Sequence, residues 1–363
     1  MFSKCLALSF LLSLIPPSFC VATADVSQRD QSELRVFALN VWQEGTVVGG
    51  GFDMIVDLII ESKADIVALA EVRNYHGKDF HKRLIATLEE KGHTFQGQYV
   101  GGDAGLISRF PITKTKNVFS TSKQEDAGSL LAYHIEIAPN LTLIIGSAHL
   151  DYRNFATYSP RGYHHSTFEI IDPDGDGEPN PETNLKTVLQ IDKSSQRGPA
   201  IEAFVAYTKA HNLDGSPAIL MGDFNECSHL DWTEETKDLF SHNGMVIPWS
   251  NSIFLMENGF VDAYRELHPN PVTHPGATWP SDAEGQGSTS WAPQCDERDR
   301  IDFVYYNRGR LQAQSSVLAG SAQYYVFNKL VTPVVEDGFT LQDLPWPTDH
   351  KGVIVDFRVT QAK

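Results

Sequence analysis

The sequence predicts an α/β fold in which helices pack outside two central β-sheets. Short apolar runs typical of buried strands recur along the chain, and segments with apolar residues at helical spacing lie between some of them. No internal repeat or long linker divides the chain. Its 363 residues, 41% hydrophobic and 21% charged, suit one α/β domain of ordinary composition.

Strands and helices alternate at the start of the expected fold. Residues 34–40 are an apolar run that ends in a polar residue, and residues 66–72 are a second such run. Residues 52–63 carry apolar side chains at helical spacing, and residues 79–91 form an amphipathic segment that Gly92 would stop. The order strand–helix–strand–helix follows.

Strands dominate the remainder of the chain. A turn at Pro139-Asn140 would join two of them into a hairpin, and a helix is expected at residues 198–212. The expected strands are residues 105–108, 130–137, 141–150, 218–225, 300–306 and 352–359.

A polar insert interrupts this pattern at about residues 152–196. It is rich in His, Pro and Asp and has no clear periodicity. A loop of this length in a compact domain is usually functional or disordered. Aspartates alternate within it before Gly177, as at the start of a calcium loop, but the twelfth position is Thr183 rather than Glu. Structural Ca²⁺ and a solvated acidic turn are the two interpretations. The candidate ligands are Asp172, Asp174 and Asp176.

The N-terminus is typical of a secretory signal peptide. A short basic start is followed by an apolar stretch and by a small-residue cleavage site, Ala22-Thr23-Ala24. We expect cleavage after residues 1–24 and a secreted or periplasmic protein; an uncleaved anchor is the alternative. No other apolar run is long enough for a membrane span, so stable membrane insertion is not expected.

Loss of the signal peptide would leave a strongly acidic protein. Cleavage removes Lys4 and no acidic residue, so the net charge would go from −17 to −18. Such a surface repels polyanions and disfavours a nonspecific nucleic-acid binder, which depends on Lys and Arg. A nuclease is not excluded, because bound cations can reverse the sign of the local charge.

Only two cysteines would remain after cleavage, Cys227 and Cys295. An even pair in an exported protein predicts a disulfide, with two free thiols as the alternative.

Several expected strands end in, or adjoin, residues that bind metals or carry out acid–base chemistry. One such case is weak evidence, because buried strands often end in a polar turn residue. Six cases in one chain are harder to attribute to turns. A fold that brings these ends together would make one acidic cleft with two histidines. The residues are Asn40, Glu71, His149, Asp223 with Asn225, Asp302, and Asp349-His350.

The segments around these residues resemble the endonuclease/exonuclease/phosphatase family, which includes deoxyribonucleases, abasic-site endonucleases, neutral sphingomyelinases and inositol polyphosphate 5-phosphatases. They occur in the family's order, and MGDFNE and TDHKGV are the strongest motifs. The resemblance implies a four-layer α/β sandwich over residues 25–363, with the site at one edge of its two sheets. The segments are LNVW, ALAEVR, GLISRFPI, SAHLDYR, MGDFNE, DRIDFVYY and PTDHKGV.

This resemblance also implies a metal site. Hydrolysis of a phosphate ester needs an in-line water and stabilisation of charge on the phosphoryl oxygens, which a divalent ion on hard oxygen ligands supplies. Glu71 would be the principal ligand of Mg²⁺ or Mn²⁺. Asn40 and Asp349 would complete the site directly or through water.

The catalytic roles implied by the family centre on two histidines and two aspartates. Asp302 would hold the tautomer of His350, which lies next to the phosphate. Asp223 would orient or deprotonate the attacking water, and His149 would donate to a phosphoryl oxygen or to the leaving group. Asn225 would bind the phosphate. Whether Asp223 or His350 is the general base stays open, since such groups titrate together.

Substrate specificity is determined by the loops rather than by these motifs. Arg109 and Arg153 are candidates for binding the substrate phosphate, because a guanidinium can donate two hydrogen bonds to phosphate oxygens at once. Ordinary surface salt bridges are the alternative. Tyr152, Tyr158 and Trp232 are candidates for an apolar wall around a sugar or head group, with plain packing as the alternative. The position of Cys227 resembles that of a disulfide cysteine in secreted deoxyribonucleases.

The sequence therefore predicts a secreted metal-dependent phosphoesterase. A phosphodiesterase acting on a small, sugar- or lipid-linked phosphate ester is favoured. A secreted deoxyribonuclease-like endonuclease and a phosphomonoesterase are the alternatives, and a noncatalytic binding protein is the alternative from another class. The expected partner is the phosphate ester, nucleic acid is the less favoured partner, and a monomer is expected.

Overall fold

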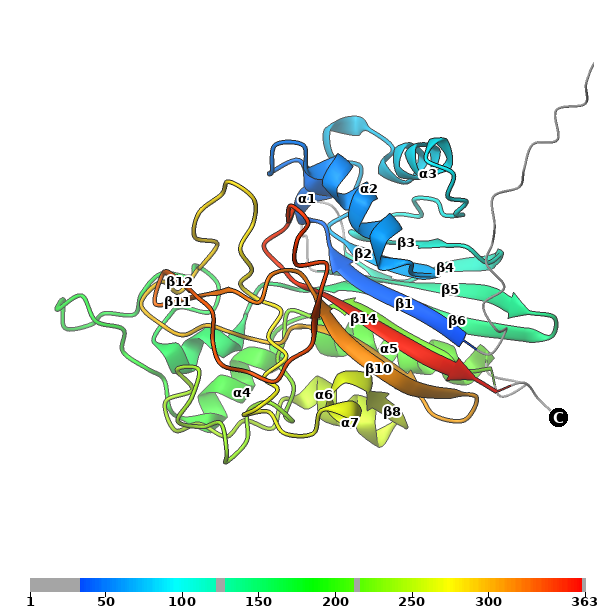
Figure 1. The fold of residues 1–363 in the computed structure, drawn as a ribbon. Coiled ribbons are helices and arrows are strands. Elements are labelled where there is room, and N and C mark those ends of the chain that lie inside the picture. Colours follow the sequence, from blue (N-terminus) through cyan, green and yellow to red (C-terminus); the bar gives the residue numbers. More distant parts are fainter. Residues whose placement is uncertain (1–32, 122–127, 212–215, 361–363) are drawn as a thin grey trace, which may run out of the picture.

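Two six-stranded sheets form the centre of the molecule, shown in Figure 1 as a computed structural model that describes residues 33–121, 128–211 and 216–360. The first sheet has the order β13 (Phe339–Thr340), β10 (Leu311–Ala319), β14 (Gly352–Val359), β1 (Glu33–Asn40), β2 (Ile66–Ala70), β3 (Ala104–Ser108). The second has the order β4 (Ile112–Ser120), β5 (Gly128–Ala138), β6 (Leu141–Leu150), β7 (Ala218–Asp223), β9 (Asp302–Asn307), β8 (Phe260–Asp262).

Helices cover the outer faces of both sheets and complete four layers. α2 (Gly51–Ser62) and α3 (Phe80–Glu90) share an apolar cluster with the first sheet. α5 (Arg197–His211) and α6 (Ser250–Glu257) share another with the second sheet. In Figure 1 these pairs lie on opposite sides of the strands. The remaining helical elements are α1 (Trp42–Gly45), η1 (Tyr75–Gly77), η2 (Ala156–Arg161), α4 (Leu185–Lys193) and α7 (Ala263–Leu267).

Both faces of the central strands are buried, which explains their unbroken apolar runs. On β1, Val36 and Ala38 belong to the core between the sheets, whereas Phe37 and Leu39 pack with the outer helices. Successive side chains of a strand point to opposite faces, so one strand supplies two apolar layers. These runs made β1, β2, β6 and β14 predictable, and the helical spacing did the same for α2 and α3.

The elements that the sequence did not reveal are more polar. β4 is an edge strand with several exposed side chains, and β10 carries Gln and Ser on its less buried positions. The insert, expected to lack regular structure, contains η2 and α4. Its aromatic residues join the long segment between β7 and β9 in a separate apolar cluster with members such as Phe155, Trp232 and Trp279. In Figure 1 the insert extends from the sheets at the left, together with the pair β11 (Tyr324–Val326) and β12 (Lys329–Val331).

The strand register collects the candidate site residues at one edge of the two sheets. β1 and β2 run parallel with Asn40 opposite Ala70, so Asn40 lies beside Glu71, the next residue. β6 and β7 run parallel with His149 opposite Asp223, and β9 places Asp302 opposite Asp223 from the other side. Three candidate residues therefore form one row across the second sheet.

The expected signal peptide, residues 1–24, lies outside the described residues. Within the part of the chain that the structure describes, no helix has both the length and the apolar character needed to cross a bilayer.

The glycine of MGDFNE is required by the approach of β6. Gly222 has a φ of +132°, and a Cβ added there would lie 2.1 Å from the carbonyl oxygen of Ala148. Real Cβ atoms do not come this close to backbone, so the strand that delivers Asp223 needs glycine immediately before it.

Gly222→Ala is expected to lower the free energy of unfolding by about 2 kcal/mol or more, because it adds a backbone clash to an unfavourable φ. Urea denaturation measures the change. Gly309→Ala is the matched control, since Gly309 has a φ of +110° and no heavy atom within 4 Å of its added Cβ. Equal losses in the two variants would show that φ alone, and not the approach of β6, requires glycine at position 222.

Candidate active site

A pocket of about 240 Å³ opens where the polar strand ends meet. Charged candidate residues from both sheets and several aromatic side chains line it. The lining residues are Trp42, Gln43, Glu71, Arg73, Tyr75, His149, Tyr152, Phe155, Tyr158, Asp223, Asn225, Trp279, Trp291, Ile301, Asp349 and His350. Asn40 and Asp302 lie behind this lining and contact it through hydrogen bonds.

The Asn40 side chain joins the two sheets. Its Nδ2 donates to Glu71 Oε1 at 3.2 Å and to Asp223 Oδ2 at 3.0 Å, while its Oδ1 accepts from the backbone N–H of Trp42 at 2.9 Å. Glu71 Oε2 accepts in turn from the N–H of Gln43 at 2.8 Å. The buried amide thus fixes the position of one carboxylate from each sheet.

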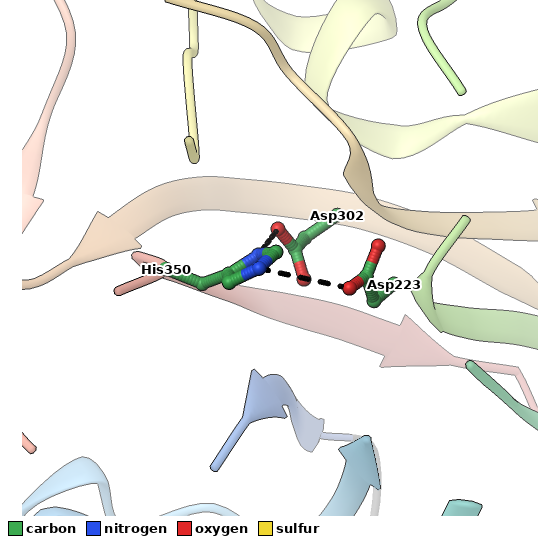
Figure 2. Close-up of side chains that lie close together, drawn as sticks. All are labelled: Asp223, Asp302 and His350. Atoms are coloured by element: carbon green, nitrogen blue, oxygen red, sulfur yellow. Dashed lines mark hydrogen bonds and ion pairs between the residues drawn. The ribbon is translucent and has the colours of Figure 1, made fainter. Parts of the chain in front are cut away.

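His350 lies between two aspartates of the second sheet (Figure 2). Its Nδ1 is 2.9 Å from Asp302 Oδ2, a hydrogen bond, and its Nε2 is 3.7 Å from Asp223 Oδ2, an ion-pair distance. Burial lowers the pKa of His350, but Asp302, Asp223 and Asp349 outweigh that effect and raise it to about 10. The surrounding carboxylates therefore favour the imidazolium form of His350, with a proton on each ring nitrogen.

Further contacts hold Asp302 and His350 in place. Its backbone N–H donates to Thr278 Oγ1 at 3.1 Å, and the Trp279 ring lies 4.9 Å from the His350 ring, centroid to centroid. These contacts fix the orientation of the Asp302–His350 pair that the family resemblance implied.

His149 has a partner that the sequence did not suggest, Asp103. His149 Nδ1 lies 2.9 Å from Asp103 Oδ2, and Arg73 donates to both oxygens of the same carboxylate at 2.9 and 2.7 Å. Burial lowers the pKa of His149, but Asp103, Asp223 and Glu71 raise it to about 10. Asp103 lies in the segment VGGDAG just before β3, where a polar residue next to a buried strand was the available signal.

The oxygen-rich part of the pocket lining fits a divalent cation. Burial, reinforced by Glu71 and opposed by His350, raises the pKa of Asp349 to about 7. A cation bound beside a carboxyl group with so high a pKa would lower that pKa and restore the ionised form. Glu71 and Asp349 supply the hard oxygen atoms that Mg²⁺ and Mn²⁺ prefer, and the Asn40 carboxamide lies beside them, with its NH₂ group on Glu71 and its oxygen on the Trp42 N–H.

A second group of atoms also has a spacing that suits a metal. Ligand atoms of Asp223, Asp302 and His350 lie within 4.8 Å of one another. Because His350 Nδ1 already shares a proton with Asp302 Oδ2, we favour an acid–base role for this trio and a metal role for the all-oxygen set.

Four residues at this edge of the sheets have a strained backbone. Trp42, Gln43, Glu71 and Asn225 are non-glycine residues with φ of +39°, +55°, +63° and +49°. Such conformations persist where the surrounding structure holds them, and they cluster at functional sites. The Asn225 N–H donates to Asp223 Oδ1 at 2.9 Å and its Nδ2 donates to the Leu150 carbonyl at 3.1 Å, and these bonds hold Asn225 in the pocket lining.

Arg109, expected near the phosphate, lies at the opposite edge of the first sheet. β3 runs antiparallel to β2 with Ser108 opposite Ile66, so Arg109 follows the end of β3 that is far from Glu71. Its Nε donates to the Ala64 carbonyl and its guanidinium stacks over the Phe95 ring. The prediction for Arg109 is wrong, because an antiparallel turn reverses the chain direction between the two motifs.

The other candidates for substrate contacts differ in whether they line the pocket. Tyr152 and Tyr158 line the pocket as predicted, whereas Trp232 is buried and stacks on His242. Arg153 does not line the pocket, and its Nε donates to Asp151 Oδ1 at 3.0 Å. Its proposed phosphate contact stays a prediction.

The predicted disulfide between Cys227 and Cys295 is not formed, and both residues are buried free thiols. The Cys295 thiol donates to the Arg161 carbonyl at 3.4 Å, and Cys227 Sγ lies 3.8 Å from Thr157 Oγ1. Burial raises the pKa of Cys295 to about 11, so the reactive thiolate is scarce at neutral pH.

The aspartates of the predicted calcium loop satisfy the loop's own backbone. Asp172 accepts from the N–H groups of Gly175 and Gly177 at 2.7 and 2.9 Å, and Asp176 accepts from Glu178 at 3.0 Å. Among the described residues, Asp172, Asp174 and Asp176 are not gathered as a metal-spaced group. Calcium at this loop stays a prediction.

Arg197 fastens the insert to the catalytic strand. Its side chain is buried, and its three nitrogens reach five acceptors. Two are carboxylates, one in α4 and one in the residue after Asn225, and three are carbonyls at the start of the insert. The acceptors are the carboxylates of Asp192 and Glu226 and the carbonyls of Asp151, Arg153 and Asn154. The insert is therefore a fixed wall of the pocket.

Comparison with known proteins places this geometry in context. The model of the Endonuclease/Exonuclease/phosphatase family matches residues 40–350. An uncharacterized protein of Caenorhabditis elegans is 27% identical over 283 residues, which are 75% of this chain and 78% of that protein. Among solved structures, D. rerio TDP2 complexed with single strand DNA product has 14% identity and a TM-score of 0.50, over 90% of this chain and 100% of that chain. An endonuclease/exonuclease/phosphatase from Beutenbergia cavernae DSM 12333 has 18% identity and a TM-score of 0.48, over 91% and 72%.

Asp103→Asn is expected to move the alkaline limb of the pH–rate profile of phosphate-ester hydrolysis to lower pH. Wild-type His149 keeps its proton up to its pKa of about 10, and loss of the Asp103 charge lowers that pKa. The rate should fall about 10-fold or more above the new pKa, the scale of one acid–base group.

The titration of His149 by NMR checks the cause of this change. Arg73→Met is the control, because it removes the other partner of Asp103 and leaves the His149–Asp103 pair in place. An unchanged His149 pKa in Asp103→Asn would contradict the assignment.

Proposed function

Because the chain belongs to the Endonuclease/Exonuclease/phosphatase family, a family of metal-dependent phosphoesterases, we propose that it is a secreted phosphodiesterase acting on a small phosphate ester linked to a sugar or a lipid. The observation that carries the choice of a small ester is the pocket. Its volume is about 240 Å³, below the usual range of roughly 300 to 1,000 Å³ for sites that enclose drug-sized ligands. Such a space holds the phosphate of a diester and one modest substituent, with the second substituent left outside the pocket.

The charge of the pocket supports the same choice. Among the described residues that line it, Arg73 is the one Lys or Arg, and its guanidinium is committed to both oxygens of Asp103. Substrates with several phosphates, and long nucleic acids, are held by clusters of Lys and Arg. The scarcity of such side chains here, together with the overall charge of −17, favours an ester with a single phosphate group.

Asn40, Glu71 and Asp349 would hold Mg²⁺ or Mn²⁺ in the pocket. A divalent ion bound there supplies Lewis-acid stabilisation of the phosphoryl oxygens. The chain's own residues then position the substrate: the Asn225 amide faces the pocket beside Asp223, and His149 offers an Nε2–H at the same edge.

Asp223 is the better candidate for the general base. Its Oδ2 lies 3.8 Å from His149 Nε2 and 3.7 Å from His350 Nε2, so a water bound to Asp223 lies among the catalytic groups. The burial of Asp223 raises its pKa, which makes it a stronger base than an ordinary aspartate. His350 is already protonated on both nitrogens and has no site for another proton.

His350 and His149 would then act as charged donors. An imidazolium at this edge stabilises negative charge that develops on the phosphoryl oxygens, and it can protonate a leaving oxygen. Asp302 and Asp103 keep the two rings charged and oriented.

The reaction is tested with purified protein and Mg²⁺ on bis(p-nitrophenyl) phosphate and on plasmid DNA in parallel. We expect diester hydrolysis with an intact plasmid, and a loss of at least about 10²-fold in Glu71→Ala, the scale of one removed electrostatic stabiliser. Glu71 is partly exposed, so circular dichroism and thermal melting should show a folded variant.

Each other outcome of this assay selects an alternative. Rapid nicking of the plasmid, lost in Glu71→Ala, would make the protein a secreted deoxyribonuclease-like endonuclease. With p-nitrophenyl phosphate as a third substrate, turnover of this monoester without hydrolysis of the diester or the plasmid would make it a phosphomonoesterase. Absence of turnover on every ester would favour a binding protein. Full activity in Glu71→Ala would refute the metal assignment.

Secretion is tested separately. The chain expressed in an export-competent host is expected to appear outside the cytoplasm with Asp25 as its first residue, which N-terminal sequencing reads directly. A full-length chain retained in the membrane fraction would support the uncleaved anchor.

A further inference from the structure

Four aromatic residues that line the pocket have no role in the chemistry described so far. They are Tyr152, Phe155, Trp279 and Trp291, and we refer to them as the aromatic subsite. Two of them come from the insert and two from the segment between β8 and β9. They are uncharged, unlike Glu71, Asp223 and Asp349, which line the same pocket.

The subsite begins one ring away from the catalytic residues. The Trp279 ring lies 4.9 Å from the His350 ring on one side and 5.3 Å from the Trp291 ring on the other, measured between centroids. A substituent that projects from a phosphate beside His350 therefore meets Trp279 first and Trp291 next.

Trp291 is the accessible member of this wall. It keeps 43% of its surface exposed, whereas Trp279 is 4% exposed and Phe155 is 5% exposed. A single exposed tryptophan needs no explanation on its own. Trp291, however, lines the pocket and is held between two rings, Trp279 and Phe168, the latter at 4.7 Å.

A buried carboxylate fixes the wall from behind. Glu297 Oε2 accepts from Tyr158 Oη at 2.7 Å and from the N–H of Ala292, the residue after Trp291, at 3.0 Å. Trp279 Nε1 donates to the same Tyr158 hydroxyl at 3.4 Å. One side chain thus holds the insert, Trp279 and the loop of Trp291 in a single arrangement, as a preorganised binding surface requires.

We propose that the aromatic subsite binds one uncharged ring of the substrate, a sugar or an aryl group attached to the phosphate, and that Trp291 determines this specificity. The proposal rests on the proposed phosphoesterase function for the role of the charged residues. Aromatic side chains give flat, apolar area at little entropic cost, and an uncharged ring fits a wall without charged side chains. The pocket volume of about 240 Å³ leaves room for about one ring beside a phosphate and excludes the acyl chains of a lipid from its interior.

Binding of non-hydrolysable phosphonates by calorimetry in Mg²⁺ tests the subsite without relying on turnover. The probes are methylphosphonate, phenylphosphonate and the phosphonate analogue of glucose 6-phosphate, which share the charged group and differ in the ring. At least one ring phosphonate is expected to bind about tenfold or more tightly than methylphosphonate, the scale of one ring stacked on an aromatic side chain. The ring phosphonate with the lower dissociation constant shows whether the substrate carries an aryl group or a sugar.

The Trp291→Ala variant should lose most of this tenfold preference, and Trp291→Phe should keep a large part of it, because Phe retains a ring. Phe327→Ala is the control: Phe327 is 54% exposed and does not line the pocket, so its removal should leave all three dissociation constants unchanged. Thermal melting verifies that each variant is folded.

Equal dissociation constants for the three probes in the wild type would overturn the proposal, as would a preference that survives in Trp291→Ala. Diester hydrolysis is measured on the same preparations. Active enzyme without ring preference would overturn the subsite alone, whereas ring preference in a protein that hydrolyses no ester would overturn the proposed reaction and keep the subsite.

Discussion

The hydrogen bonds of the Asn40 carboxamide are the interaction on which the site depends. One NH₂ group binds a carboxylate that follows the first sheet, Glu71, and a carboxylate that ends a strand of the second, Asp223. Away from this edge the two sheets meet mainly through an apolar core, and at the edge the His149–Asp103 and His350–Asp302 pairs add two more polar contacts between them. A buried polar contact with defined geometry sets the register of one sheet edge against the other, so Glu71 and Asp223 face one pocket.

Charge organises the remainder of the pocket. Glu71, Asp223, Asp302 and Asp349 converge in a largely buried space, and mutual repulsion would destabilise them without cations. The chain supplies part of the compensation through His149 and His350, whose pKa values are raised to about 10. The all-oxygen set leaves room for a divalent ion to supply more. In the reaction we propose, the same imbalance that costs stability would supply the acid, the base and the metal affinity that hydrolysis of an ester needs.

The sequence was sufficient for what depends on local pattern and insufficient for what depends on long-range packing. Strands with two buried faces are unbroken apolar runs, so β1, β2 and β14 were predictable, and polar residues at their ends pointed to Asn40, Glu71 and His350. Asp103 was missed because its role comes from a contact with His149, 46 residues away. Arg109 was misplaced because strand direction, not motif identity, decides which edge a residue occupies. Trp291 gave no signal, since an isolated aromatic residue in a loop becomes part of a wall only through its neighbours.

The five acceptors of Arg197 have a consequence for how this scaffold can diversify. A loop that is tied to the catalytic strand by one buried guanidinium cannot be exchanged freely between homologues, because a graft without the matching carboxylates would leave an unpaired buried charge. The insert and its anchor should therefore be inherited as one module, with Arg197, Asp192 and Glu226 gained or lost together. An engineer who exchanges this loop to change the substrate should therefore exchange more than the loop. The exchanged segments should include the first turn of α5 and the residue after MGDFN.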